Sequence, residues 1–107
     1  MKKTVVGVLE TVEIAGKKYR ARIDTGAKLS SLDKKTARKL NLGKTIRNAK
    51  VKSAHGISLR PVIRVKVKIK SRIITASFNL ADRSHMKYKV LIGRNILRNG
   101  FLIDITK

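Results

Sequence analysis

The sequence predicts an all-β fold, a small closed barrel with one or two short helices, from three observations. Residues 63–70 alternate strictly between β-branched residues and Lys or Arg, as in a half-buried strand. The other apolar runs are short and are separated by turns that contain Gly or Ser. Only residues 31–40 and 95–99 have helical spacing. No linker or repeat divides the 107 residues, so we expect one domain over residues 1–107.

The N-terminal region is predicted to be a hairpin. Its first strand runs from residue 4 to residue 14, with Val6 and Val8 on one side. The chain turns at residues 15–16, where Gly follows Ala, and a second strand covers residues 17–24. This second strand alternates between Tyr, Ala or Ile and Lys or Arg, so one of its faces should be buried.

A short helix is predicted after this hairpin. Either Ser31 or Asp33 could cap its N-terminus, and the apolar residues up to Leu40 fall roughly on one face. Gly43 should end it.

The second half of the chain is predicted to be strands joined by turns. Pro61 places the early part of the long strand at an edge or a bend, because Pro has no N–H to donate. The expected elements are a weak strand at 46–53, a turn at 54–56, strands at 57–70 and 73–80, a polar loop at 81–89, a strand at 90–93, a helix at 95–99 and a strand at 101–105.

The strongly basic composition indicates which binding partners the protein attracts. Lys and Arg number 27 against 6 Asp and Glu, which gives a net charge of +21. Such a chain attracts polyanions, whether nucleic acid, acidic peptide or an anionic surface. The chain has two Tyr, two Phe and no Trp, fewer aromatics than a protein that stacks single-stranded bases usually needs. The lack of Cys excludes disulfides and thiolate metal ligands.

The sequence also bears on location. Its apolar runs are too short to span a bilayer, so we expect no membrane association. The basic residues Lys2 and Lys3 and the apolar run after them resemble the start of a signal peptide, but Gly7 interrupts the run and Glu10 ends it. We therefore expect a strand there and a cytoplasmic protein.

One acidic residue stands at a distinctive place, the end of the strand that covers residues 17–24. Asp24 is followed by Thr25, Gly26 and Ala27. Gly allows a tight turn and the close approach of another chain or a ligand, and Thr can hold nearby backbone with its hydroxyl group. A strand that ends in an Asp-containing turn is common, so this tetrapeptide alone is weak evidence for catalysis.

A second segment makes the first more informative. Residues 90–97 read Val-Leu-Ile-Gly-Arg-Asn-Ile-Leu, an apolar strand that meets Gly and then a short helix. By itself this is an ordinary buried strand with a turn. Together, Asp-Thr-Gly-Ala, the turn at His55-Gly56 and Ile-Gly-Arg-Asn-Ile-Leu resemble, in this order, the single-domain retropepsin-like aspartic proteases. The resemblance implies their small closed barrel and covers nearly the whole chain.

The sequence is more similar to a prokaryotic branch of these proteases than to the viral enzymes. That branch carries Ile-Asp-Thr-Gly-Ala-Lys with a following Ser, here residues 23–30, and Asp-Arg-Ser-His-Met-x-Tyr-x-Val-Leu-Ile-Gly-Arg, here residues 82–94. It bears the label ATP-dependent zinc protease. The chain has no His-Glu-x-x-His and no Gly-rich phosphate loop, and its only histidines are His55 and His85. We expect no zinc, no ATP and no other cofactor, and histidines that are exposed or structural.

The resemblance implies an aspartic peptidase that works as a homodimer. Such enzymes use two carboxylates that share one proton, one to activate water and one to polarise the scissile carbonyl. The chain has one Asp-Thr-Gly, so the dyad would be Asp24 and its mate across a two-fold axis. Thr25 would lock the two loops together, and Gly26 would let backbone and substrate approach.

The resemblance also implies supporting residues. Ala54, His55, Gly56 and Ile57 would form the tip of a flap over the substrate, although an ordinary exposed turn explains them equally well. Gly93, Arg94 and Asn95 would support the active-site loop. In viral members an acid that follows Asp-Thr-Gly-Ala pairs with this Arg, whereas here Lys28 follows. We therefore expect Arg94 to pair with Asp82 or Asp104.

The charge suggests a substrate, because members of this branch often occur beside ATP-grasp ligases that add glutamates to proteins. A groove rich in Lys and Arg would favour acidic, glutamate-rich peptides. Two alternatives remain open. The charge alone also fits a basic β-barrel that binds nucleic acid, and the barrel could bind acidic peptides without catalysis.

Overall fold

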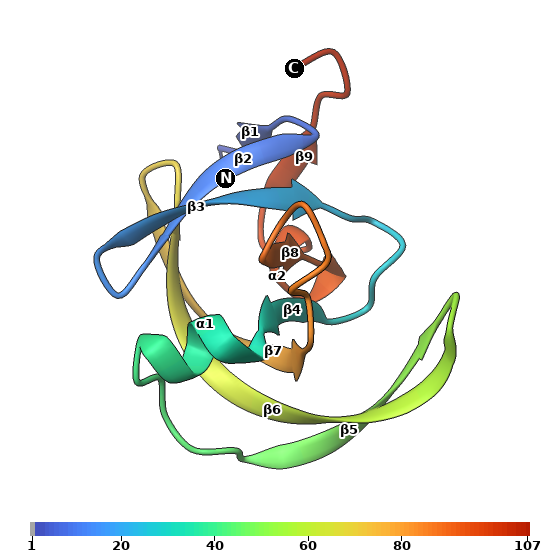
Figure 1. The fold of residues 1–107 in the computed structure, drawn as a ribbon. Coiled ribbons are helices and arrows are strands. Elements are labelled where there is room, and N and C mark those ends of the chain that lie inside the picture. The colour runs from blue at the N-terminus through green and yellow to red at the C-terminus, as the bar shows by residue number, and fades with distance from the viewer. Residues whose placement is uncertain (1) are drawn as a thin grey trace.

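The computed structural model describes residues 2–107, which form nine strands and two short helices (Figure 1). Met1 lies outside the described residues. In chain order the elements are β1 (Thr4–Val6), β2 (Leu9–Ile14), β3 (Lys17–Ile23), β4 (Ser30–Asp33), α1 (Lys34–Lys39), β5 (Arg47–Ser53), β6 (Gly56–Ile69), β7 (Arg72–Ala81), β8 (Val90–Ile92), α2 (Arg94–Leu97) and β9 (Phe101–Ile103).

Six of these strands close into a barrel, as the sequence predicts. The sheet runs in the order β2-β3-β8-β4-β7-β6, and the pairing of β2 with β6 closes the ring. The β3–β8 and β4–β7 pairs are parallel, and the other pairs of the ring are antiparallel. Every second residue of β6 from Ile63 onward points into the barrel. Ile63, Val65, Val67 and Ile69 therefore join Phe78 in the core. The prediction of an all-β closed barrel is therefore confirmed.

The hairpin of β5 and β6 extends beyond the barrel (Figure 1). Among the described residues, the first part of β6, from Gly56 to Pro61, pairs only with β5, and its pairing with β7 begins at Val62. Pro61 therefore lies where one side of the strand has no neighbour, which suits a residue without an N–H group. The predicted bend or edge at Pro61 is confirmed.

The prediction of a single strand over residues 4–14 is wrong. The chain breaks at Gly7 and Val8 into β1 and β2, and β1 pairs in parallel with β9. The buried carboxylate of Glu10 accepts a hydrogen bond from the N–H of Gly7 at 2.7 Å, which draws the backbone out of the strand. Val8 is 42% exposed and does not join Val6 in the core.

The prediction for residues 31–40 is half correct. The helix α1 exists, and Asp33 caps it by accepting a hydrogen bond from the N–H of Thr36. It ends at Lys39, with Leu40 as its C-cap residue, and not at Gly43. The residues before it form an unpredicted strand, β4, whose four residues are all buried. This strand lies between β7 and β8 and continues from the loop that begins at Asp24.

Candidate active site

Asp24 lies directly after β3, at the start of the loop that leads to β4. Its N–H donates to the carbonyl of Ile92 at 2.9 Å, so the end of β8 fixes its backbone. Its side chain is half-buried, and Oδ1 accepts a hydrogen bond from the N–H of Gly26 at 2.9 Å. Among residues 2–107, Gly26 is the only donor to this carboxylate. The turn therefore holds Asp24 in one orientation and leaves its second oxygen, Oδ2, available.

The backbone around α2 holds the next part of this loop. The N–H groups of Arg94 and Asn95 donate to the carbonyls of Ala27 and Lys28 at 2.8 and 3.2 Å. The approach is so close that a Cβ atom on Gly93 would lie 2.8 Å from the carbonyl oxygen of Ala27. Only Gly fits at this position, since no Cβ atom can approach backbone so closely without displacing it.

Side chains of Ser30 and Asn95 complete the support. The hydroxyl group of Ser30 donates to Oδ1 of Asn95 at 2.8 Å and accepts from the N–H of Gly93 at 2.9 Å. The amide Nδ2 of Asn95 donates to the carbonyl of Ser77 on β7 at 2.9 Å. The structure thus places Gly93 and Asn95, two predicted support residues, against the loop that begins at Asp24.

Arg94 also reaches this loop, but not through an acid. Its Nη1 donates to the carbonyl of Thr25 at 2.9 Å. Asp82 and Asp104 instead accept hydrogen bonds from the Ser and Thr two residues after them, within their own turns. The prediction that Arg94 pairs with Asp82 or Asp104 is therefore wrong. The backbone of Arg94 already lies against the loop, which brings the carbonyl of Thr25 within reach.

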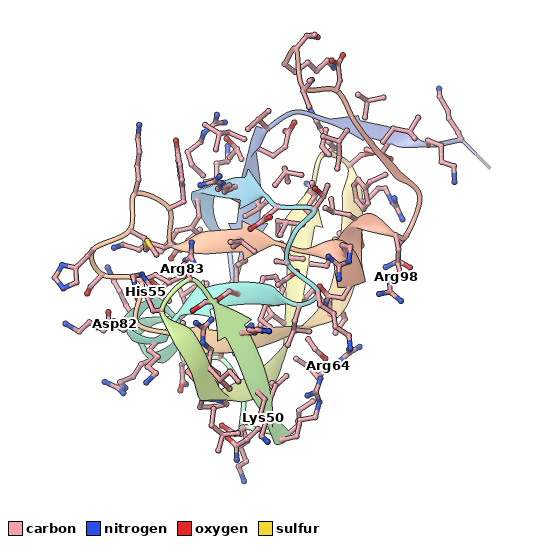
Figure 2. The ribbon with its side chains drawn as sticks, turned by 90° about the vertical axis from the view of Figure 1, so that its right-hand side faces the viewer. Lys50, His55, Arg64, Asp82, Arg83 and Arg98 are labelled. Carbon is pink, nitrogen blue, oxygen red and sulfur yellow. The ribbon has the colours of Figure 1, made fainter. Side chains whose placement is uncertain are left out.

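The predicted flap residues form the exposed tip of the β5–β6 hairpin. Ala54 and His55 make the turn, and Gly56 has a φ of +105°, a conformation that suits Gly. Ile57, just inside the tip, is 70% exposed. His55 and His85 are both exposed, as predicted (His55 is labelled in Figure 2).

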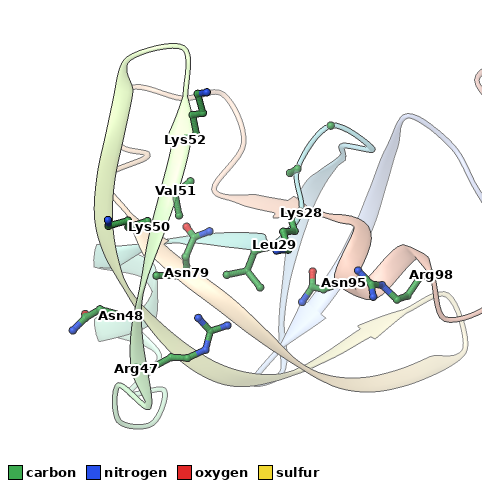
Figure 3. Close-up of a pocket in the computed structure, with 13 residues that line it drawn as sticks. Lys28, Leu29, Arg47, Asn48, Lys50, Val51, Lys52, Asn79, Asn95 and Arg98 are labelled. Carbon is green, nitrogen blue, oxygen red and sulfur yellow. The ribbon is translucent and has the colours of Figure 1, made fainter.

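A groove of about 790 Å³ lies between this hairpin and the loop that follows Asp24 (Figure 3). The consecutive residues 47–52 of β5 line it, because the strand presents its free edge to the groove. In Figure 3, Arg47 and Val51 point toward the groove, whereas Asn48 and Lys50 point away. The remaining walls are Gly26, Ala27, Lys28, Leu29, Asn79, Asn95 and Arg98.

The groove is basic. Lys28, Arg47, Lys52 and Arg98 are among its lining residues, as is Lys50, whose side chain points away. No carboxylate of the chain from residue 2 onward lines the groove. Asp24 itself is not a lining residue, but its turn supplies Gly26 and Ala27 to the wall. The sequence predicts a basic groove but does not identify the residues that line it. The orientation of β5 determines which cations face the groove, and the sequence alone does not reveal that orientation.

Asp33 ties three segments together beside the site. Burial favours a higher pKa for its carboxyl group, but other contacts outweigh burial and lower the pKa. These are hydrogen bonds from the N–H of Arg83 and from the N–H and hydroxyl of Thr36, together with the nearby charge of Lys89. The Arg83 bond is 2.9 Å long. The carboxylate thus links β4 and α1 to the loop before β8, a role that the sequence did not indicate beyond the cap.

Two features of the fold concern metals and membranes. Over residues 2–107, no three side chains of His, Asp or Glu gather in a way that could hold a metal ion. No helix in this range has the length and apolar character needed to cross a membrane.

Comparison with known proteins agrees with this architecture. No curated protein matches the chain. A solved structure of a Legionella pneumophila protein of unknown function has the same fold, with a TM-score of 0.69 and 18% sequence identity over 97% of this chain and 94% of that one. A family model described as "RimB-like: Retropepsin-like aspartic endopeptidase RimB" matches residues 33–107. The match includes the segment around Gly93 and begins after Asp24. By this match the chain belongs to the RimB-like family of retropepsin-like aspartic endopeptidases.

Proposed function

We propose that this protein is an aspartic endopeptidase in which Asp24 and the Asp24 of a second copy form the catalytic dyad. The observation that carries the proposal is the setting of Asp24. Its carboxylate is fixed by Gly26, and its loop is held by Gly93, Arg94 and Asn95, so that one oxygen is oriented while the other can act on water. Such preorganisation is what general acid–base catalysis requires.

A second copy is needed because one chain supplies one such carboxylate. Two carboxylates at close range share a proton, so one is ionised and can accept a proton from water while the other donates to the scissile carbonyl. Apolar surface near the chain ends supports the pairing of two copies. Val5 and Leu102 are register partners in the β1–β9 sheet, yet they are 38% and 53% exposed. A second copy that covered them would remove apolar area from water.

Acidic peptides are the substrates that the groove favours. An extended peptide could pair with the free edge of β5, where main-chain groups give affinity and side chains give selectivity. The cations around the groove would attract carboxylates along that peptide and repel basic sequences. The β5–β6 hairpin would act as a flap that excludes water, with exposed Ile57 and Leu59 available to cover the substrate or meet the second flap.

The decisive experiment compares the purified protein with the Asp24→Asn variant. Oligomeric state is measured by sedimentation, and cleavage is measured on glutamate-rich and lysine-rich peptides across a range of pH. We expect a dimer that cuts the glutamate-rich peptides faster, and no cleavage by the variant. Cleavage that persists in Asp24→Asn, or that comes from a monomer, would overturn the dyad.

The basic groove also favours a second candidate function, which is binding of a polyanion without turnover. It predicts that Asp24→Asn leaves all function unchanged and that affinity for nucleic acid or acidic peptide falls steeply with salt. Asp82→Asn is a control for the loss of one carboxylate, because Asp82 is exposed and Ser84 is its only hydrogen-bond partner among residues 2–107.

A further inference from the structure

The outer face of β3 and β6 carries cations that the proposed active site does not use. Along β6, every second residue is exposed and alternates with a core residue, and along β3 the exposed and inward residues alternate in the same way. The exposed cations of these two strands form a surface that we call the basic wall: Lys18, Arg20, Arg64, Lys66 and Lys68.

Strand register brings the cations of the two strands onto one surface. Strand β2 lies between β3 and β6, and its Glu13 is the register partner of Lys18 on one side and of Lys68 on the other. Register partners point to the same face of a sheet. Because neighbouring strands lie about 4.8 Å apart and alternate residues about 6.7 Å apart, the basic wall extends about 13 Å along β6 and about 10 Å across the three strands.

Two adjoining hollows lie in this face. One, of about 370 Å³, is lined by Lys18, Arg20 and Lys68, and the other, of about 350 Å³, by Arg64, Lys66 and Lys68. Glu13 and Lys68 line both, so the hollows meet where β2 pairs with β6.

The basic wall is separate from the groove beside Asp24. No residue that lines either hollow lines that groove. In Figure 1, β3 runs from the turn after β2 to the loop that leads to β4, with Lys18 near its start and Asp24 directly after its end. Six residues of strand span about 20 Å. A ligand on the basic wall would therefore leave the groove open.

The charges of the basic wall are not neutralised within the described residues. The single ion pair found over residues 2–107 joins Lys70 to the buried Glu10, so Glu13 pairs with neither of its register partners. Like charges that are neighbours on a sheet repel one another. A polyanion that binds along the wall would relieve this repulsion.

Hydroxyl groups lie among these cations. The guanidinium group of Arg20 donates to the hydroxyl of Thr11 at 3.1 Å, and that of Arg64 donates to the hydroxyl of Ser77 at 3.3 Å and to the carbonyl of Thr75 at 3.2 Å. Arg, Lys, Ser and Thr are the side chains that contact phosphate oxygens in complexes with nucleic acid. The chemistry of the wall thus suits a phosphate backbone.

The wall has no means of stacking on bases. Phe78 and Phe101 are buried, Tyr19 packs against the core, and Tyr88 lies in the loop before β8. Proteins that bind single strands stack bases on exposed aromatic side chains, whereas a duplex presents its backbone. A membrane surface would need apolar side chains to insert, and among residues 2–107 Ile73 is the only exposed large apolar residue that lines either hollow.

We propose that the basic wall binds the phosphate backbone of a nucleic-acid duplex, without reading its sequence. A duplex carries one negative charge per about 1.7 Å, so about seven phosphates face the 13 Å of the wall and can match its cations. The proposal does not rest on Asp24 as a catalytic residue. It also differs from polyanion binding in the groove, because it assigns the nucleic acid to another face of the barrel.

The test compares two variants that each lose three positive charges. The wall variant combines Lys18→Gln, Lys66→Gln and Lys68→Gln, and the groove variant combines Lys28→Gln, Arg47→Gln and Lys52→Gln. Dissociation constants are measured by fluorescence anisotropy over a range of salt concentrations. The probes are an RNA duplex, a DNA duplex of the same sequence and the corresponding single strands. Urea denaturation checks that each variant is folded.

We expect the wild type to bind a duplex with a dissociation constant of about 10⁻⁶–10⁻⁴ M at physiological salt. Each lost phosphate contact lowers the slope of log K against log salt by about 0.9, so the wall variant should lose about 2–3 from this slope and about tenfold or more in affinity. The groove variant should lose less than about 1 from the slope. Tighter binding of the RNA duplex would identify RNA as the ligand, and equal binding would identify the backbone that both duplexes share.

A second variant should change the affinity in the opposite direction. Glu13→Gln removes the acid between Lys18 and Lys68, so it should tighten duplex binding by about twofold or more at low salt. Asp82→Asn makes the same charge change in the loop before β8, where Asp82 is exposed, and should tighten binding less.

Four results would overturn the proposal. They are a groove variant that loses as much affinity as the wall variant, a Glu13→Gln protein that binds no more tightly than Asp82→Asn, single strands that bind as well as duplexes, and wall-dependent binding to phosphatidylserine vesicles without binding to duplexes. If the wall variant does not fold, the comparison of Glu13→Gln with Asp82→Asn decides. Because no cleavage is measured, an inactive protein would overturn the proposed peptidase and leave this test intact.

Discussion

Ser30 and Asn95, which are 65 residues apart, are joined by two hydrogen bonds to one atom: Oδ1 of Asn95 accepts from both the N–H and the hydroxyl group of Ser30, at 2.9 and 2.8 Å. Ser30 is fully buried at the start of β4. The same amide of Asn95 also donates to β7. One side chain thus fixes the end of the loop that begins at Asp24 and joins it to the barrel.

Replacing Asn95 with Ala should therefore destabilise the protein. Two donors of Ser30 would lose their acceptor inside the barrel, and a buried donor without a partner costs about 1–3 kcal/mol. We expect the free energy of unfolding, measured by urea denaturation, to fall by about 2–4 kcal/mol. Asn99→Ala is the control, because Asn99 is exposed and makes one bond to the backbone of α2. Equal losses in the two variants would contradict the role given to Asn95.

Gly93 should tolerate no side chain. Its φ of −100° is open to any residue, so the constraint comes from space alone. A Cβ atom would lie 2.8 Å from the carbonyl carbon of Leu29 and the carbonyl oxygen of Ala27, and neither backbone group can move without displacing the loop. We expect Gly93→Ala to lower the free energy of unfolding by about 1–3 kcal/mol, as overpacking does, and to lower the proposed peptidase activity with it.

Gly43→Ala is the matched control for this change. A Cβ atom on Gly43 would meet no atom of residues 2–107 within 4 Å. The control should unfold at the same urea concentration as the wild type or slightly above it. A Gly93→Ala protein as stable and as active as the Gly43→Ala protein would show that the loop can shift at no cost.

The elements that the sequence predicts are those whose signal is local. Alternation in residues 63–70 depends only on which face of β6 is buried, and the Asp24 turn depends on residues two apart in the chain. The strand β4 is different. Ser30 and Ser31 are polar and resemble the cap of a helix, and they are buried because Asn95 and Asn79 satisfy their hydroxyl groups. A partner 48 or 65 residues away leaves no periodic pattern in the sequence.

The same limit applies to the candidate site. Asp24, Gly93 and Asn95 could be named because motifs carry them. Arg47 could not, since its place in the groove depends on the register and orientation of the β5–β6 hairpin. Arg94 was assigned an acidic partner because charge pairing is the simplest expectation for Arg, but a carbonyl oxygen is an equally good acceptor when the backbone brings it close.

Asp33 should stabilise the fold in a pH-dependent way. Its pKa in the folded state is lowered from the ordinary value of 3.8, so the folded state favours the ionised carboxylate more than the unfolded state does. This stabilisation is complete above the unfolded pKa and is lost as the pH falls through 3.8 toward the lower, folded pKa. At neutral pH we expect Asp33→Asn to lower the free energy of unfolding by about 2 kcal/mol, the combined effect of a cap and a bond to a charged acceptor.

The difference between wild type and Asp33→Asn should shrink as the pH is lowered below about 4, because the wild-type carboxyl group becomes protonated. Urea denaturation across this pH range measures it. A difference that stays constant with pH would mean that packing, and not the charge, carries the effect. Asp82→Asn is the control, since Asp82 is exposed and its lowered pKa comes from Ser84 within the same turn.

For the proposed cleavage of acidic peptides, the cations that face the groove should govern the Michaelis constant. Arg47 points toward the groove from β5, and Lys28 lines it from the opposite loop. Replacing each by Glu places a negative charge beside the expected path of the peptide, which should raise KM for a glutamate-rich peptide by about fivefold or more at low salt. The effect should weaken as salt is added, because exposed charges are screened. Lys68→Glu makes the same charge change on the exposed side of β6 and should alter KM little. If all three variants raise KM equally, the overall charge of the protein, and not the groove, attracts the substrate.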